Sequence, residues 1–315
     1  MALNFTEAWQ RFWYVSGGTF NLGLFRILFA VCLFHELSAT EWFSVFAIKG
    51  GFHLPYVWFI QPVTPDIFRW MVNLQYPLIL LLAVGLFSRV SCGALLLLQG
   101  YIFFADQMNF RNHPYFYLLV LLLLLFSPLD DALSLKSILR AWKNRQPLFE
   151  SVLGNQSLLT FQRLIQVQVC IVYIYAALQK MNATYLNGTL LEIYIREEFL
   201  RGKAGKILEA TLSQSSLFAL MDFLYSGPIF VGLAILSLAL ELFIPLALWH
   251  RKTRPLAIIL GVAFHFMLYL AMDVFGFSFA MIGTYLLFID PEALVARVRA
   301  MILRHRAGLK LKVQS

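Results

Sequence analysis

The stretch Asn112-His113-Pro114-Tyr115-Phe116-Tyr117 leads directly into Leu118–Phe126, whose residues LLVLLLLLF include no polar side chain. In lipid a backbone must satisfy its own hydrogen bonds, so a segment this apolar is expected to be a membrane helix. Polar and ionisable side chains at membrane depth are costly, and those that persist commonly serve a function. The stretch therefore predicts a membrane helix that carries candidate functional groups at its first turn.

The composition of the whole chain also indicates a membrane protein. Of its 315 residues, 60% are hydrophobic and 13% are charged, whereas soluble domains have about half apolar and about a quarter charged residues. A water-soluble fold of this size could not cover so much apolar surface. The net charge of +8 comes from basic residues between and after the apolar runs, which indicates membrane topology rather than nucleic-acid binding.

The three cysteines, Cys32, Cys92 and Cys170, lie far apart, each in or beside an apolar run. None belongs to a CxxC pair or to a cysteine–histidine spacing typical of metal sites. We therefore expect small buried thiols, with no metal, haem or disulfide.

The apolar runs predict an all-α polytopic membrane protein, a bundle of about eight transmembrane helices with interfacial amphipathic helices. A transmembrane helix needs about 20 mostly apolar residues, and several of these runs are short. One membrane domain is expected over 1–315, with its core at 18–292 and a basic tail at 293–315. The first run could instead be a signal peptide, although Arg26 interrupts it. The predicted spans are 20–38, 71–88, 90–105, 113–128, 161–179, 227–249, 255–272 and 274–290.

Basic residues predict the orientation of these helices. Arg89, the group at 140–145, the run at 250–254 and the tail all fall on one side of an eight-span arrangement. Cytoplasmic loops are enriched in lysine and arginine, so both termini are expected in the cytoplasm. Amphipathic helices along the membrane surface are predicted at 5–15, at 41–60 and within the outer segment 180–226.

Four polar side chains are candidates for a site toward the outer side of the membrane: His113, Lys180, His265 and Asp273. In this orientation His113, Lys180 and Asp273 lie at outer helix ends, as does Asp106, and His35 and Glu36 lie close to such an end. His265 lies about two or three turns deeper. Independent anchors would scatter over both faces, so the shared placement predicts one cavity that is open to the outer leaflet.

Each candidate also has a structural explanation. Asn112 is a favourable N-cap for the helix that follows it, and His113 could be solvated at that helix end. Lys180 could extend to the interface from the end of its span. His265 could be a core histidine whose hydrogen bonds are satisfied.

Two further charges lie inside predicted spans. Arg26 is about 9 Å from the cytoplasmic end of the first span, and Glu241 is about 12 Å from that end of the sixth. Neither charge is stable alone in hydrocarbon, so a structural ion pair between them is predicted.

Several short segments follow one another in an order that is shared with a known family: Leu24-Phe25-Arg26-Ile27-Leu28-Phe29, Asn112-His113, Ala177-Leu178-Gln179-Lys180-Met181-Asn182, Tyr185-Leu186-Asn187-Gly188 and Phe264-His265-Phe266-Met267. From about residue 18 to 292 the sequence resembles the membrane part of vitamin K-dependent γ-glutamyl carboxylase. The family's bacterial members are the HTTM (horizontally transferred transmembrane) domain proteins. The resemblance implies an integral protein of a bacterial inner membrane, with its site toward the periplasmic or extracellular side.

The resemblance also implies an enzyme that uses reduced vitamin K or a menaquinone-type hydroquinone, dioxygen and, for carboxylation, carbon dioxide. Lys180 matches the lysine that takes a proton from the quinol, and His113 matches the histidine that assists it. Asn112 and His265 match positions in the same site, and Asp273 joins them as a quinol-binding candidate by its depth. Quinol oxygenation to the epoxide would then drive proton abstraction from a substrate, with glutamate carboxylation as one outcome.

These residue types suit that chemistry. A quinol hydroxyl is phenol-like and needs a neutral amine as its base, and an amine in apolar surroundings loses its proton more readily. His113 could donate to the developing oxyanion, while Asn112 positions the ring. Gln179 stands where the carboxylase has a second lysine, and the resemblance covers the membrane part only. Quinol handling is therefore expected ahead of carboxylation.

Two other functions remain open. A non-catalytic membrane partner or chaperone for the maturation of a secreted peptide would use 180–226 as its docking surface. A transporter is disfavoured, since no pair of short, Gly- or Pro-broken spans stands in inverted positions. The expected partners are the lipid bilayer, an isoprenoid quinol and a secreted or membrane peptide, with no nucleic acid.

Overall fold

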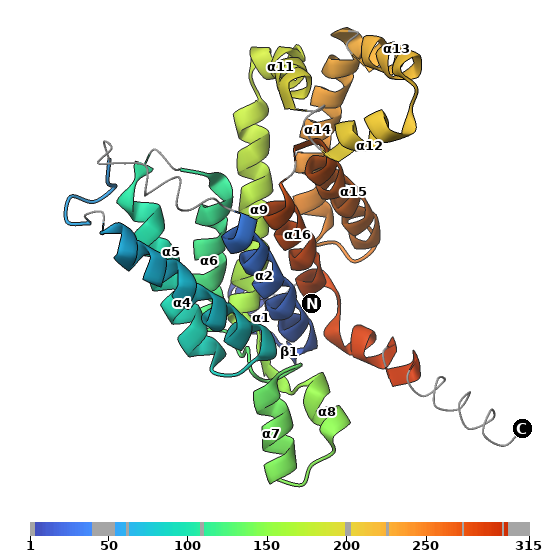
Figure 1. The fold of residues 1–315 in the computed structure, drawn as a ribbon. Helices are drawn as coiled ribbons and strands as arrows, with labels where there is room; N and C mark the ends of the chain where they lie inside the picture. Colours follow the sequence, from blue (N-terminus) through green and yellow to red (C-terminus); the bar gives the residue numbers. More distant parts are fainter. Residues whose placement is uncertain are drawn as a thin grey trace, which may run out of the picture. The chain divides into compact units, whose positions relative to one another are not determined.

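The computed structural model shows a helical chain that divides into two compact units (Figure 1). The first unit comprises Met1–Ile165 and Ile289–Ser315, and the second comprises Gln166–Phe288. The predicted single domain spans both units. The structure describes residues 4–39, 54–60, 63–107, 110–198, 203–224, 227–272, 274–297 and 299–301.

The predicted fold class is confirmed. Among the described residues, six helices are long and apolar enough to cross a membrane, and one bent pair of helices could add a seventh. They are α2 (Phe20–Ala39), α4 (Pro65–Val84), α5 (Ser88–Ala105), α9 (Thr160–Lys180), α14 (Gly227–Ala247, which qualifies from Pro228) and α15 (Arg254–Met272).

Two of the eight predicted spans differ from these six helices. The span predicted at 113–128 is α6 (Asn112–Leu125), an apolar helix of only 14 residues. The span predicted at 274–290 is α16 (Phe275–Thr284) followed by the 3-10 helix η2 (Tyr285–Phe288). That segment qualifies as a span only together with Pro291–Met301, beyond a break in the helix.

In the first unit, α4 packs on α2 and on α5, and α5 packs on α6. Thr64 caps α4, with its hydroxyl accepting from the Ile67 N–H, and Pro65 begins the helix. Gly85 ends α4 in the left-handed conformation, at φ 72°. A side chain here would collide with Ser134, so glycine is required for the short turn into α5.

The first unit also contains a small two-stranded sheet. Strand β1 (Ser16–Gly18) pairs antiparallel with β2 (Gln156–Leu158), so that Ser16 lies opposite Leu158. The Glu292 carboxylate accepts hydrogen bonds from the Gly18 N–H at 3.2 Å and from the Gln156 amide at 3.0 Å. The segment after Ile289 is thereby attached to the sheet. The unit also contains α1 (Phe5–Trp13), α7 (Leu135–Lys143) and α8 (Leu148–Leu153).

The second unit is built around α15, which packs on α14, α16 and α12. Short helices fill the predicted outer segment 180–226, as its amphipathic pattern indicated. They are α10 (Ala183–Leu186), α11 (Thr189–Glu198), α12 (Lys203–Thr211) and α13 (Gln214–Leu224). The helix predicted at 5–15 is α1, which exposes Phe5 and Trp9. Most of the helix predicted at 41–60 lies outside the described residues.

Candidate functional site

Lys180, the predicted base, forms an ion pair inside the second unit. Its Nζ lies 2.5 Å from Oε1 of Glu241 on α14. The lysine side chain is 27% exposed and the glutamate 4%. Glu241 is about 21 Å along α14 from Gly227, the first residue of that helix. The amine thus bonds to a buried carboxylate well inside an apolar helix. The structural explanation, in which Lys180 extends to the interface, did not include such a partner.

The segment that follows Lys180 explains why the amine lies beside the middle of α14 and not at a free end of the bundle. Helix α9 ends at Lys180, and the next residues run along α14 toward its first turns. The Tyr185 hydroxyl lies 2.6 Å from that of Ser237, one turn before Glu241. Gly188, with φ 82°, packs against the backbone of Phe230 and Val231, where a side chain would collide. The segment 181–188 therefore continues past Lys180 instead of leaving the bundle at that point.

Local capping holds this segment in place. The Asn182 side chain accepts from the Tyr185 N–H at 2.9 Å and begins α10. The Asn187 side chain accepts from the Thr189 N–H at 3.0 Å at the start of α11. Asparagine favours such caps because its short side chain reaches the free backbone N–H groups of a first turn. The residues that follow Lys180 thus form two short capped helices, α10 and α11, which pack against α14.

The ion pair predicted between Arg26 and Glu241 is replaced by other contacts. Glu241 pairs with Lys180. Arg26 is fully buried, and its guanidinium donates to the carbonyls of Leu133, at 2.6 Å, and Leu129. The prediction was wrong because depth along a helix does not specify which side chains face each other. Loop carbonyls also offer acceptors that need no buried counter-charge.

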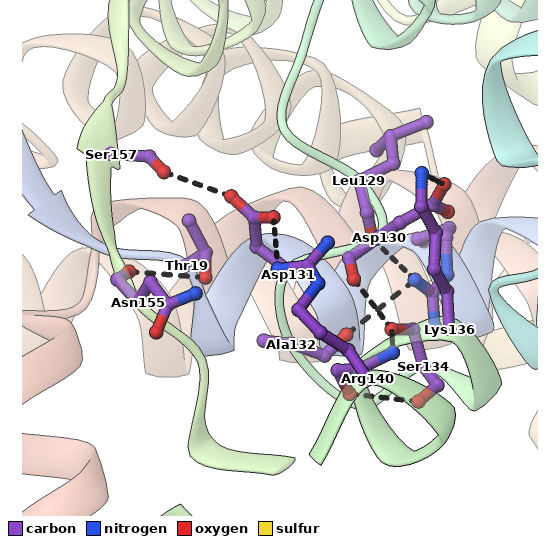
Figure 2. Close-up of polar contacts among 12 residues, drawn as sticks. Thr19, Leu129, Asp130, Asp131, Ala132, Ser134, Lys136, Arg140, Asn155 and Ser157 are labelled. Atoms are coloured by element: carbon purple, nitrogen blue, oxygen red, sulfur yellow. Dashed lines mark hydrogen bonds and ion pairs between the residues drawn. The ribbon is translucent and has the colours of Figure 1, made fainter. Parts of the chain in front are cut away.

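The loop that receives Arg26 is itself cross-linked by polar contacts (Figure 2). The Ser134 hydroxyl donates to the Asp130 carbonyl at 2.6 Å, and Lys136 lies 3.1 Å from the Asp130 carboxylate. The hydroxyl of Ser157, in strand β2, donates to Asp131 at 2.9 Å. Arg26 therefore holds the loop that follows α6 in place through hydrogen bonds to its carbonyls. Its role is structural.

His113 also has an acidic partner, within the first unit. Its Nε2 lies 3.1 Å from Oε1 of Glu36 on α2, with side chains 17% and 19% exposed. Tyr117, one turn further along α6, is buried, and none of the described residues forms a hydrogen bond with its hydroxyl. Asn112 is exposed and is not the N-cap: the helix begins at Asn112 itself, and Arg111 before it makes no side-chain cap.

His265 is buried in the second unit, with 2% of its surface exposed. Its Nε2 lies 2.8 Å from the hydroxyl of Tyr173, which also hydrogen-bonds to the hydroxyl of Tyr285. Tyr173 precedes Lys180 by two helical turns on the same face of α9. Asp273 lies outside the described residues.

Three partners of the candidate residues were missing from the predicted site: Glu241 beside Lys180, and Tyr173 and Tyr285 beside His265. The seven-residue spacing from Tyr173 to Lys180 was a usable signal for one of them. The predicted meeting of His113 with Lys180 joins residues of different units and stays a prediction. Within the described residues no three His, Cys, Asp or Glu side chains could hold a metal ion together.

Comparison with known proteins gives a family for this arrangement. The model of the HTTM domain matches residues 18–292, which includes every candidate residue described above. This domain is shared with the membrane region of vitamin K-dependent carboxylase. No solved structure matches the chain. With its multiple apolar helices, the chain is an integral membrane protein that belongs to the HTTM domain family.

Proposed function

We propose that this protein is a membrane enzyme that deprotonates a reduced naphthoquinone and couples quinol oxygenation to proton abstraction from a second substrate. Glutamate carboxylation is one form that the second step could take. The observation that carries the proposal is the Lys180–Glu241 pair, an amine and a carboxylate held 2.5 Å apart within apolar helices. Ionisable groups at such depth are costly to keep and favour a chemical role.

The chemistry of the donor set fits a phenolic ligand. Deprotonation of a quinol hydroxyl requires a basic nitrogen, and Lys180 supplies a primary amine. Glu241 Oε2 is buried and has no hydrogen-bond partner in the part of the chain that the structure describes, so an acceptor remains available beside that amine. The surrounding helices are apolar enough for a bilayer, which gives an isoprenoid molecule a route from the lipid. When bound, the quinol supplies the reducing equivalents and, with dioxygen, the strong base.

Each residue then has a definite task. Transfer of the Lys180 proton to the Glu241 carboxylate leaves Lys180 Nζ as a neutral amine, which then accepts the proton of the quinol hydroxyl while Glu241 holds it in position. His113, oriented by Glu36, donates a hydrogen bond to the oxygen that loses its proton. The apolar helices exclude water, which would otherwise quench a strong base. His265 is proposed as a further ligand-binding group.

The test is quinol turnover by purified protein. Menaquinone or vitamin K hydroquinone is supplied with oxygen, and the epoxide is measured by mass spectrometry for the wild type and for Lys180→Ala. Lys252→Ala is the matched control, since this lysine is exposed in the turn before α15. We expect epoxide from the wild type and the control. Lys180→Ala should lose about 100- to 10,000-fold, the usual contribution of a general base.

Two results would oppose the proposal. The first is the absence of epoxide with several quinols, and the second is an equal yield from Lys180→Ala. A specific observation supports the chaperone alternative in that case: helices α11–α13 expose Leu190, Ile193, Ile207 and Phe218. Polar substitutions there would then abolish maturation of the secreted peptide, whereas Lys180→Ala would leave it intact.

A further inference from the structure

Three buried side chains of the second unit form a continuous hydrogen-bonded chain. Tyr285 of η2 bonds through its hydroxyl to the hydroxyl of Tyr173 on α9, which lies 2.8 Å from Nε2 of His265 on α15. Each of the three is only 2% exposed. At the far end of the chain, His265 Nδ1 is buried and has no hydrogen-bond partner among the described residues.

Counting donors and acceptors assigns a direction to this chain. If His265 carries its proton on Nε2, it donates to Tyr173, and Tyr173 donates to Tyr285. The Tyr285 hydrogen and the bare Nδ1 are then both left without a partner. If the proton is on Nδ1, Tyr285 donates to Tyr173, Tyr173 donates to Nε2, and only the Nδ1–H lacks a partner. Since each unsatisfied buried group destabilises the fold, the second arrangement is favoured.

We infer that Tyr173 and Tyr285 hold His265 as the Nδ1–H tautomer, so that Nδ1–H is a preset donor for an oxygen atom of an apolar ligand. The two tyrosines are positioning residues, because they act on the ligand only through His265. The inference rests on the proposed function and deepens it, by assigning a second contact to the quinone class of ligand.

The packing around the imidazole supports an apolar ligand. The ring centroids of Phe264 and Phe277 lie 5.5 and 5.8 Å from that of His265. Both rings meet the imidazole edge-on, so its surroundings are apolar and favour an apolar ligand over a charged one. The ligand oxygen must accept a hydrogen bond from the N–H donor, as a quinol hydroxyl, the oxyanion that it forms and a quinone carbonyl all can. A quinone ring carries both features.

Gly261 indicates that the tyrosine chain is built into the packing. It lies one turn before His265 on the same face of α15. A Cβ at this position would overlap the hydroxyl and the ring of Tyr285. The absence of a side chain is therefore what admits the Tyr285 ring to the face of α15 that carries His265. Tyr173 and Lys180 lie seven residues apart on one face of α9, so the hydrogen-bonded residues and the proposed base share that face.

The tautomer can be measured without turnover. Full-length protein labelled with nitrogen-15 in histidine is examined by NMR, which separates protonated from unprotonated ring nitrogens. His265→Gln assigns the signal, and the exposed His250 serves as the internal control. We expect a proton on Nδ1 in the wild type and a mixture of tautomers in Tyr173→Phe. A wild-type proton on Nε2 would overturn the inference, whatever the enzyme does.

The ligand contact is tested with oxidised menadione, a quinone that cannot start the reaction. Its binding should shift the His265 Nδ1 signal and leave His250 unchanged. Its affinity should fall roughly tenfold in Tyr173→Phe, which loses the preset donor. Binding without a shift at Nδ1 would indicate that a buried water satisfies this atom, and would overturn the inference alone. Failure of menadione to bind at all would count against both the inference and the proposed function.

Discussion

Arg26 in the first unit and Lys180 in the second are both cations among apolar helices, yet their surroundings differ. Arg26 is fully buried and donates to neutral backbone carbonyls. Lys180 is partly exposed, and its partner is the carboxylate of Glu241, which can itself gain or lose a proton. Burial alone therefore does not mark a functional charge. A titratable partner and partial access to the amine distinguish a group suited to proton transfer.

The largest effect is expected for Arg26→Leu. This change leaves the Leu129 and Leu133 carbonyls without their donor, and each bond to a charged group contributes about 1.5–3 kcal/mol, or about 3–6 kcal/mol together. Thermal unfolding in detergent should show a large loss of stability. Arg26→Lys should recover only part of it, since a compact ammonium cannot reproduce the guanidinium fork. An unchanged midpoint would contradict the structural role of Arg26.

Lys180→Met should show the opposite balance. Its stability should fall by only about 1–3 kcal/mol, because the Glu241 carboxyl can take up a proton once it lacks a partner. Quinol turnover should nevertheless be lost. The double variant Lys180→Met/Glu241→Leu should regain stability, as apolar replacements of buried pairs often do, but not turnover. Recovery of turnover in the double variant would break the distinction between the two cations.

A smaller effect is expected for Glu36→Gln. The amide oxygen can still accept a hydrogen bond from His113, but it lacks the charge that makes the carboxylate the stronger acceptor. Because both side chains are partly exposed, the free energy of unfolding should change by less than about 1 kcal/mol. Turnover should fall roughly tenfold, through weaker support of His113. Unaltered kcat with a lower melting temperature would instead make this pair structural.

The smallest effect is expected for Lys136→Ala in the loop beneath Arg26. The Lys136 side chain is 52% exposed, so its ion pair with Asp130 is screened by solvent. Such pairs contribute about 0–1 kcal/mol. The melting temperature should change little, and less still in high salt. A loss comparable to that of Arg26→Leu would show that the loop depends on its surface charges rather than on the buried guanidinium.

Several helices could be predicted closely from the sequence. The predicted spans 90–105, 161–179 and 255–272 correspond to α5, α9 and α15 within two residues at each end. Apolar length is a property of the segment itself, so it needs no knowledge of neighbours. The start of α4 was placed six residues late, at 71 instead of Pro65. The first residues of the helix include Asp66 and Arg69, and these charges delay the start of the apolar run.

The sequence by itself determined that the chain is a helical membrane protein and which costly polar groups lie in its helices. Only the tertiary structure decided the partners of those groups: Glu241 for Lys180 rather than for Arg26, loop carbonyls for Arg26, and Tyr173 with Tyr285 for His265. The reason is geometric. A sequence specifies how far along its own helix a side chain lies, whereas a hydrogen bond depends on how the helices rotate and pack against each other.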